Sequence, residues 1–254
     1  MAPELIEPWR HLFGLALAFS WIKSALLTLR AHDMPYTSGV RRGRLPRSRL
    51  VPLLGVGAIL QLVLIEAWVL GWLVLWLPPL ILASQGAVRV IEQRQWPSDH
   101  VVRLGKYAPS SAALLAHWVV LGLSGSEAAG WEAAAGVMGA TLSLAALAKW
   151  REAGANWFKA SGMGLLVAER AAFGPAPLRW IRGRVAGSRP LSAICSQVGM
   201  GVEAAGVLFV FPSLRLWLAG AVVALLVNFF VLLGYVEEEW MLALIAVTAL
   251  STLG

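Results

Sequence analysis

A few ionisable or polar side chains lie inside otherwise apolar stretches of this 254-residue sequence. Such groups are costly at membrane depth, where they pair with one another or mark the path of a substrate or proton. Two carboxylates and an imidazole at similar depth can bind a divalent metal or pass a proton between them. The set comprises Lys23, Glu66, His117 and Glu203, with Asn228 as a neutral member.

The elements that must position these groups are predicted to be transmembrane helices. Hydrophobic residues make up 58% of the chain and charged residues 14%, whereas a globular domain carries about 25% charge. With a mean hydropathy of +0.70, this composition excludes a soluble enzyme and a disordered chain. Runs of about 20 apolar residues cross a bilayer as helices. Single spans are predicted at 11–29, 107–123, 132–148, 191–211, 214–234 and 240–253.

The stretch 50–90 is too long for one span, since as a single helix it would measure roughly 60 Å, about twice the hydrocarbon thickness. We predict a hairpin of two spans that turns between Gly71 and Pro79, with Trp68, Trp72 and Trp76 near the turn. Tryptophan favours the membrane–water boundary. The predicted fold is an all-α integral membrane protein, a polytopic bundle of about seven or eight transmembrane helices in one domain over residues 1–254.

One further helix is predicted at 155–173, interfacial or re-entrant, because apolar residues there alternate with Lys159, Glu169 and Arg170. The first apolar run is interpreted as a retained span, because residues 1–7 contain two acids and no base and lack the positive start of a cleaved signal peptide.

The net charge of +7 is concentrated in the loops of one side of this topology. The positive-inside rule makes that side cytoplasmic, and the opposite side keeps little beyond Arg10 and Arg215. We expect a bacterial inner or cell membrane, with the bilayer as partner and no nucleic acid. Binding of anionic headgroups by the basic run 41–49 is the alternative to a purely topological role. The predicted cytoplasmic bases are Arg30, Arg41, Arg42, Arg44, Arg47, Arg49, Arg89, Arg94, Arg103, Lys106, Lys149, Arg151, Arg170, Arg179, Arg182, Arg184 and Arg189.

The depths of the polar groups follow from a rise of 1.5 Å per residue. Glu66, His117 and Glu203 lie roughly 6–15 Å below the predicted outer boundary, and Lys23 and Asn228 lie nearer the middle. The structural alternative pairs Lys23 with Glu66, and His117 with Glu203 or a carbonyl, which would tie helices together. No two of these residues have the i, i+4 spacing of metal ligands on one helix, so no metal is predicted, and no cofactor is assigned.

Three further features have a structural interpretation. Cys195 is the single cysteine and is interpreted as a packing residue. The acidic run 237–239 is predicted to be a solvated helix start. The glycines at 199, 201 and 206 are spaced for close helix contact.

Two stretches resemble the HTTM family, the membrane module shared with vitamin K-dependent gamma-carboxylases and distantly with lipase maturation factors. The first is 145–149, Ala-Ala-Leu-Ala-Lys, followed by Asn-Trp-Phe at 156–158. The second runs from Val202 through Glu203 to Pro212, then Arg215, and through Asn228 to Gly234. The segment 99–103 is similar to the family's mid-chain loop. The resemblance covers about the C-terminal two thirds of the chain.

The resemblance implies roles for single residues. Lys149 stands where the carboxylases keep a lysine that acts as a base, and Glu203 stands where the family has an acidic helix residue. Asn228 replaces a typical histidine and cannot shuttle a proton. This departure, together with the cytoplasmic placement of Lys149, argues against an active carboxylase. The alternative role of Lys149 is a topology-setting charge beside Trp150.

The predicted catalytic residues are therefore Glu203, His117 and Lys149, and Glu66, Lys23 and Asn228 are predicted to line a polar cavity. The function implied is maturation or modification of an exported peptide or a lipid-like substrate. One alternative is a non-catalytic assembly subunit of a larger membrane protein complex. Another is a small-molecule or ion carrier, which the absence of an internal repeat disfavours.

Overall fold

A computed structural model describes residues 6–32, 45–95, 109–158, 160–234 and 238–253, and these residues contain helices and turns but no strand. The predicted all-α class is confirmed over this part of the chain. The chain divides into two compact units, unit 1 with Met1–Ala134 and Glu238–Gly254 and unit 2 with Ala135–Glu237. The single transmembrane domain stays a prediction.

The helices of unit 1 are α1 (Glu7–His32), α2 (Arg47–Val69), α3 (Leu77–Gln95), α5 (Pro109–Ser124) and α11 (Glu238–Leu253). Those of unit 2 are η3 (Gly154–Phe158), α7 (Ala160–Arg170), α8 (Ala176–Gly187), α9 (Arg189–Ala204), η4 (Ala205–Val210) and α10 (Pro212–Leu233). The helix α6 (Glu127–Ala153) contributes residues to both units.

Five described helical segments are long and apolar enough to cross a membrane: Glu7–Arg30, Arg47–Val69, Glu127–Trp157, Arg189–Val210 and Pro212–Leu233. The shorter α5 is apolar as well. This finding is compatible with the predicted integral membrane protein. The bases at 41, 42, 44, 103 and 106, Glu237 and the segment 99–103 lie outside the described residues.

The hairpin predicted at 50–90 is present as α2 and α3, joined by a turn over 70–76. Gly71 takes a φ of 81° in this turn, a conformation that glycine adopts without strain. The Trp118 ring nitrogen on α5 donates a hydrogen bond of 2.8 Å to the Leu75 carbonyl and holds the turn. The exposed fractions of Trp72 and Trp76 are 65% and 74%, as expected of rings that seek a membrane boundary. Trp68, the third ring expected there, is instead buried, with an exposed fraction of 3%.

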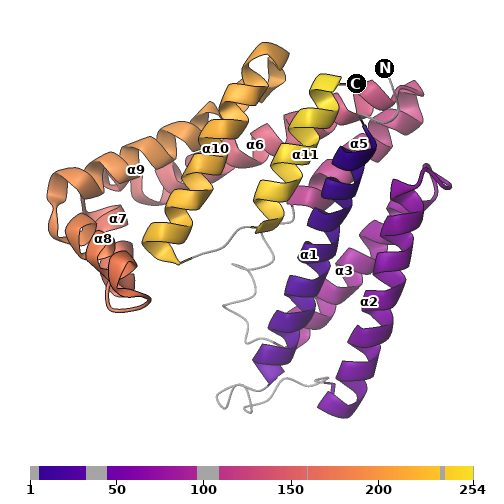
Figure 1. Ribbon diagram of the computed structural model, residues 1–254, viewed down its shortest axis with the longest axis horizontal. Coiled ribbons are helices and arrows are strands. Elements are labelled where there is room, and N and C mark those ends of the chain that lie inside the picture. The colour runs from indigo at the N-terminus through magenta and orange to yellow at the C-terminus, as the bar shows by residue number, and fades with distance from the viewer. Residues whose placement is uncertain (1–5, 33–44, 96–108, 159, 235–237, 254) are drawn as a thin grey trace. The chain divides into compact units, whose positions relative to one another are not determined.

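In unit 1, α1 packs against α2, α3, α5 and α11 (Figure 1). Trp21 and Leu50 belong to the buried apolar cluster between α1 and the hairpin. Polar ties cross the same contact: the Gln85 amide donates to the Leu17 carbonyl at 2.7 Å, and the Trp21 ring nitrogen to the Ser84 hydroxyl at 3.2 Å. Among lipid tails, which are as apolar as the helix side chains, the hydrophobic effect does not drive helices together. Hydrogen bonds between helices, such as these two, therefore contribute to helix association.

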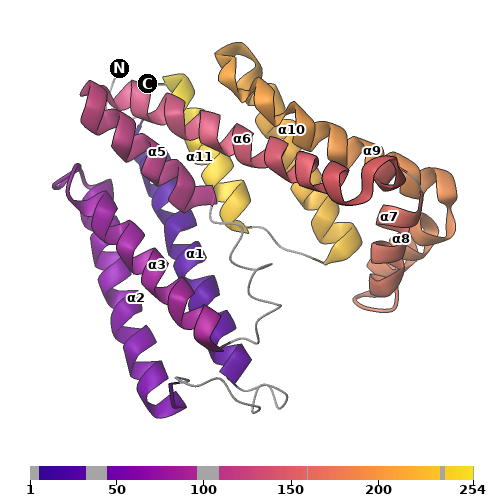
Figure 2. The same cartoon turned by 180° about the vertical axis from the view of Figure 1, so that it is seen from behind.

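In unit 2, α9 packs against α7, α8 and α10 (Figure 2). Met163 and Val167 of α7 form a buried cluster with Leu232 and Leu233 of α10. The helix predicted at 155–173 is therefore present as η3 and α7, and its interfacial location stays a prediction. The basic stretch after it, expected only as a loop, forms the helix α8.

Candidate functional site

The centre of the candidate site is an ion pair between Lys149 of α6 and Glu203 of α9. The Lys149 ammonium donates to both carboxylate oxygens of Glu203, with 2.6 Å between Nζ and Oε2. The Glu203 side chain is 7% exposed and the Lys149 side chain 27%. The carboxylate is thus buried, and the ammonium keeps one open side.

Two aromatic rings complete the surroundings of the ammonium. Its Nζ lies 5.5 Å from the ring centre of Trp157 in η3 and 5.7 Å from that of Phe229 in α10. The negative face of an aromatic ring attracts a cation at such distances. Four elements of unit 2, namely α6, η3, α9 and α10, therefore converge on Lys149.

Close backbone packing positions the pair. A Cβ atom on Gly139 of α6 would lie 2.3 Å from the Gly206 carbonyl oxygen, and one on Gly206 would lie 2.5 Å from that of Gly139. Nearby, the Ser143 hydroxyl donates to the Ala204 carbonyl at 3.3 Å. The close contact predicted for the glycine patch is confirmed at Gly206, whereas a Cβ on Gly201 would meet nothing within 4 Å.

The contacts of α6 with η4 and α9 are unevenly spaced along the two segments. From Gly139 to Lys149 the chain rises roughly 15 Å along α6, yet their contacts Gly206 and Glu203 lie only three residues apart. The sequence placed Lys149 at the cytoplasmic side and Glu203 near the outer boundary, and that separation is wrong. It assumed depths counted along separate upright helices, whereas the ion pair brings the two side chains together.

His117 of α5 belongs to unit 1 and lies in a cluster of rings. Its ring centre is 4.1 Å from that of Trp131 and 6.2 Å from that of Trp68. The side chain is 1% exposed, and neither ring nitrogen has a hydrogen-bond partner among the described residues. This environment favours a packing role, and the catalytic role stays a prediction. The partner of Glu203 is Lys149 rather than the predicted His117.

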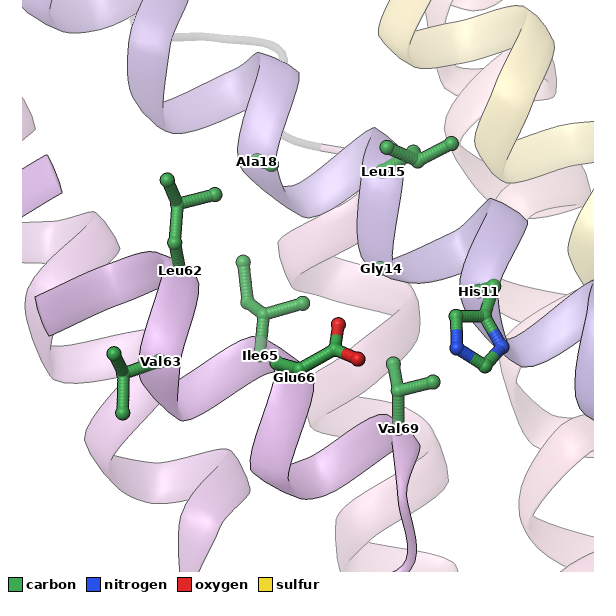
Figure 3. A pocket seen from close by; sticks show the side chains of 9 residues that line it. All are labelled: His11, Gly14, Leu15, Ala18, Leu62, Val63, Ile65, Glu66 and Val69. Atoms are coloured by element: carbon green, nitrogen blue, oxygen red, sulfur yellow. The ribbon is translucent and has the colours of Figure 1, made fainter. Parts of the chain in front are cut away.

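Glu66 lines a groove of about 480 Å³ between α1 and α2 (Figure 3). The side chain is exposed and makes no hydrogen bond or ion pair with the described residues. At the same end, the Nδ1 atom of His11 lies 3.0 Å from the Glu7 carbonyl oxygen. The remaining lining residues are Gly14, Leu15, Ala18, Leu62, Val63, Ile65 and Val69.

Lys23 does not reach Glu66. Gly14 of α1 lies against Ile65 and Val69, the residues on either side of Glu66 along α2. Lys23 lies nine residues beyond Gly14, which is roughly 14 Å along the axis of α1. Lys23 instead acts electrostatically on Glu239 of α11. The predicted Lys23–Glu66 pair is therefore wrong.

Asn228 is half-buried in α10, directly before Phe229, which flanks Lys149. Of the three predicted cavity residues, Glu66, Lys23 and Asn228, only Asn228 is adjacent in sequence to a residue that contacts Lys149. Trp157 and Phe229 were not singled out as walls of that site, although both lie in the stretches that resemble the HTTM family.

Two buried charges have roles that the sequence did not suggest. Glu239 was predicted to be solvated, but it is 6% exposed and accepts a hydrogen bond of 2.6 Å from the Ser110 hydroxyl. Arg215 was counted as a residual outer charge, but it is 1% exposed and donates to the Phe209 carbonyl at 2.7 Å. Nothing in a single sequence distinguishes these charges from solvated helix ends.

No family model, curated protein or solved structure matches this chain. The resemblance of 145–158 and 202–234 to the HTTM family stays a prediction. Among the described residues, no group of three or more His, Cys, Asp and Glu side chains could hold a metal ion.

The Lys149–Glu203 pair has two chemical capacities. Its partly open ammonium can contact a carboxylate or phosphate group. Transfer of one proton from Lys149 to Glu203 would leave a neutral amine beside a neutral acid. An amine formed in this way can accept a proton from a bound group.

Proposed function

We propose that this chain is an HTTM-like polytopic membrane protein that matures or modifies an exported peptide or a lipid-like substrate at Lys149 and Glu203. In this proposal about seven or eight helices span a bacterial inner or cell membrane, with the basic loops cytoplasmic. The predicted spans beyond the five long apolar segments are α3, α5 and α11, which are shorter or carry more charge.

The observation that carries the proposal is the ion pair itself. The two stretches that resemble the HTTM family each contribute one member of the pair, and these two residues lie more than 50 positions apart in sequence. The same stretches supply Trp157 and Phe229, the rings that flank the ammonium. An exposed fraction of 27% leaves the Lys149 side chain accessible to a substrate group.

The proposed chemistry begins with proton transfer from the Lys149 ammonium to the Glu203 carboxylate. The neutral Lys149 amine then accepts a proton from the substrate, and Glu203 gives its proton to the reacted substrate, which restores the ammonium and the carboxylate. General bases of this kind contribute about 10²–10⁴-fold to a rate. Asn228 carries no proton in this scheme.

A second function is favoured by the same contact. An ion pair between α6 and α9 can also serve only to hold the two helices together. Such a role is expected of a non-catalytic subunit of a membrane complex. The large exposed apolar side chains, such as Trp217 at 78% and Leu216 at 71%, would then face lipid or a partner subunit.

Deletion and replacement in the native cell separate the two functions. Exported peptides and membrane lipids are compared by mass spectrometry between the parent, a deletion strain and a strain with Lys149→Gln. We expect the deletion to remove or shift specific species and Lys149→Gln to reproduce that change with a normal amount of membrane-inserted protein.

The matched control is Arg151→Gln, which removes a positive charge from an exposed position two residues further along α6. It should leave every species as in the parent. A Lys149→Gln strain identical to the parent would overturn the proposal. So would a deletion that alters the amount of another membrane protein but no peptide or lipid.

A further inference from the structure

The groove between α1 and α2 has an apolar body and one polar end. Leu15, Leu62 and Val63 line the body, with exposed fractions of 52%, 47% and 59%. Figure 3 shows the Glu66 carboxylate directed towards α1 between Ile65 and Val69, with His11 on the Val69 side. The volume of about 480 Å³ lies within the range of small-molecule sites.

The polar end presents two hydrogen-bond acceptors. The His11 Nδ1 atom lies within hydrogen-bond distance of the Glu7 carbonyl, which can only accept, so a neutral ring carries its proton on Nδ1 and leaves Nε2 as an acceptor. The Glu66 carboxylate accepts only. A ligand at this end must therefore bring donors, and preferably a positive charge.

The described cations that lie nearest to His11 along α1, Arg10 and Lys23, do not supply that charge. Arg10, adjacent to His11 in sequence, forms an ion pair with Glu127. Lys23 lies twelve residues beyond His11 on α1, roughly 18 Å along the helix axis. A carboxylate within a membrane span that lacks a cationic partner is costly, so a bound cation stabilises it.

We propose that this groove binds a membrane lipid with a primary ammonium headgroup, held by Glu66 and His11, with an acyl chain along Leu15, Leu62 and Val63. The ammonium group has three N–H donors for the two acceptors. Lipid tails are as apolar as the groove wall, so the wall alone does not select a lipid. Selection comes from the headgroup.

Lipid retention tests this inference. The full chain is reconstituted in nanodiscs of equal parts phosphatidylethanolamine and phosphatidylglycerol, extracted in mild detergent, washed, and its bound lipids are quantified by mass spectrometry. We expect several-fold enrichment of phosphatidylethanolamine, against the attraction of anionic lipid to a chain of net charge +7. Glu66→Gln should abolish the enrichment. The matched control Glu169→Gln, at an exposed position of α7, should keep it.

A second pair of variants tests the groove without changing its charge. Val63→Trp should fill the groove and release the lipid, whereas Val56→Trp, at an exposed position of α2 outside the groove, should not. The inference is overturned by wild-type protein without enrichment. It is equally overturned by enrichment that survives either Glu66→Gln or Val63→Trp.

Discussion

The Arg182 guanidinium donates a hydrogen bond of 2.8 Å from Nε to the carbonyl oxygen of Val231, in the last turn of α10. A second donor of the same side chain, Nη1, reaches the Phe173 carbonyl at 2.7 Å, just after α7. The side chain is only 4% exposed. The last carbonyls of a helix lack intrahelical partners and attract cations. Arg182 supplies hydrogen-bond donors to such carbonyls at the end of α10 and just after α7.

Replacing this arginine should destabilise unit 2. We expect Arg182→Met to lower the free energy of unfolding by about 2–3 kcal/mol, because the carbonyls of Val231 and Phe173 lose the donors of a buried guanidinium. Unfolding in detergent, followed by tryptophan fluorescence, measures the change. Arg179→Met, at an exposed position of the same helix, should match the wild type. Equal stability of Arg182→Met and wild type would show that these hydrogen bonds are not needed.

The close contact of Gly139 with Gly206 makes a second prediction. Gly139→Ala should cost about 1–3 kcal/mol, since the added methyl group would meet the Gly206 carbonyl at 2.3 Å and force the helices apart. Gly136→Ala on the same helix, where a Cβ meets nothing within 4 Å, should be neutral or slightly stabilising. Thermal unfolding of both variants decides this, and a neutral Gly139→Ala is the contrary result.

His117 offers a test of function against packing. His117→Phe should change the free energy of unfolding by less than about 1.5 kcal/mol, because the ring loses no hydrogen bond to the described residues and keeps its aromatic neighbours. The variant should also leave exported peptides and lipids unchanged. A folded His117→Phe protein that alters those species would instead assign His117 a role in the chemistry.

The predicted topology is open to labelling in intact cells. In a Cys195→Ala background, Leu75→Cys in the hairpin turn should react with a membrane-impermeant maleimide. Ala176→Cys, at the exposed first residue of the basic helix α8, should react only after the cells are opened. The reverse pattern would invert the assigned sides of the membrane.

The helices and the hairpin were predictable because hydropathy and span length act locally along the chain. A bilayer limits each apolar run to about 20 residues, so the length of 50–90 alone required a turn near Gly71. The helix α8 was missed because its stretch is basic, and its buried Arg182 depends on carbonyls of other elements.

The candidate site was predictable in its members but not in its geometry. Lys149 and Glu203 were both named, yet depth counted along upright spans separated them. The close contact of Gly139 with Gly206 depends on packing between α6 and η4, which a single sequence does not specify. Glu239 was misjudged for the same reason, since its partner Ser110 lies on another helix.

The most direct test of the central claim exchanges the two charges of the pair, Lys149→Glu with Glu203→Lys. Lys149→Glu alone places two carboxylates next to each other at a largely buried site, so it should destabilise the protein. The exchange restores the ion pair and should therefore restore the stability. We predict that the exchanged protein folds normally but leaves the exported peptides or lipids as in the deletion strain, because the amine no longer extends from α6. Restoration of both stability and products would contradict the claim and leave the pair a structural tie.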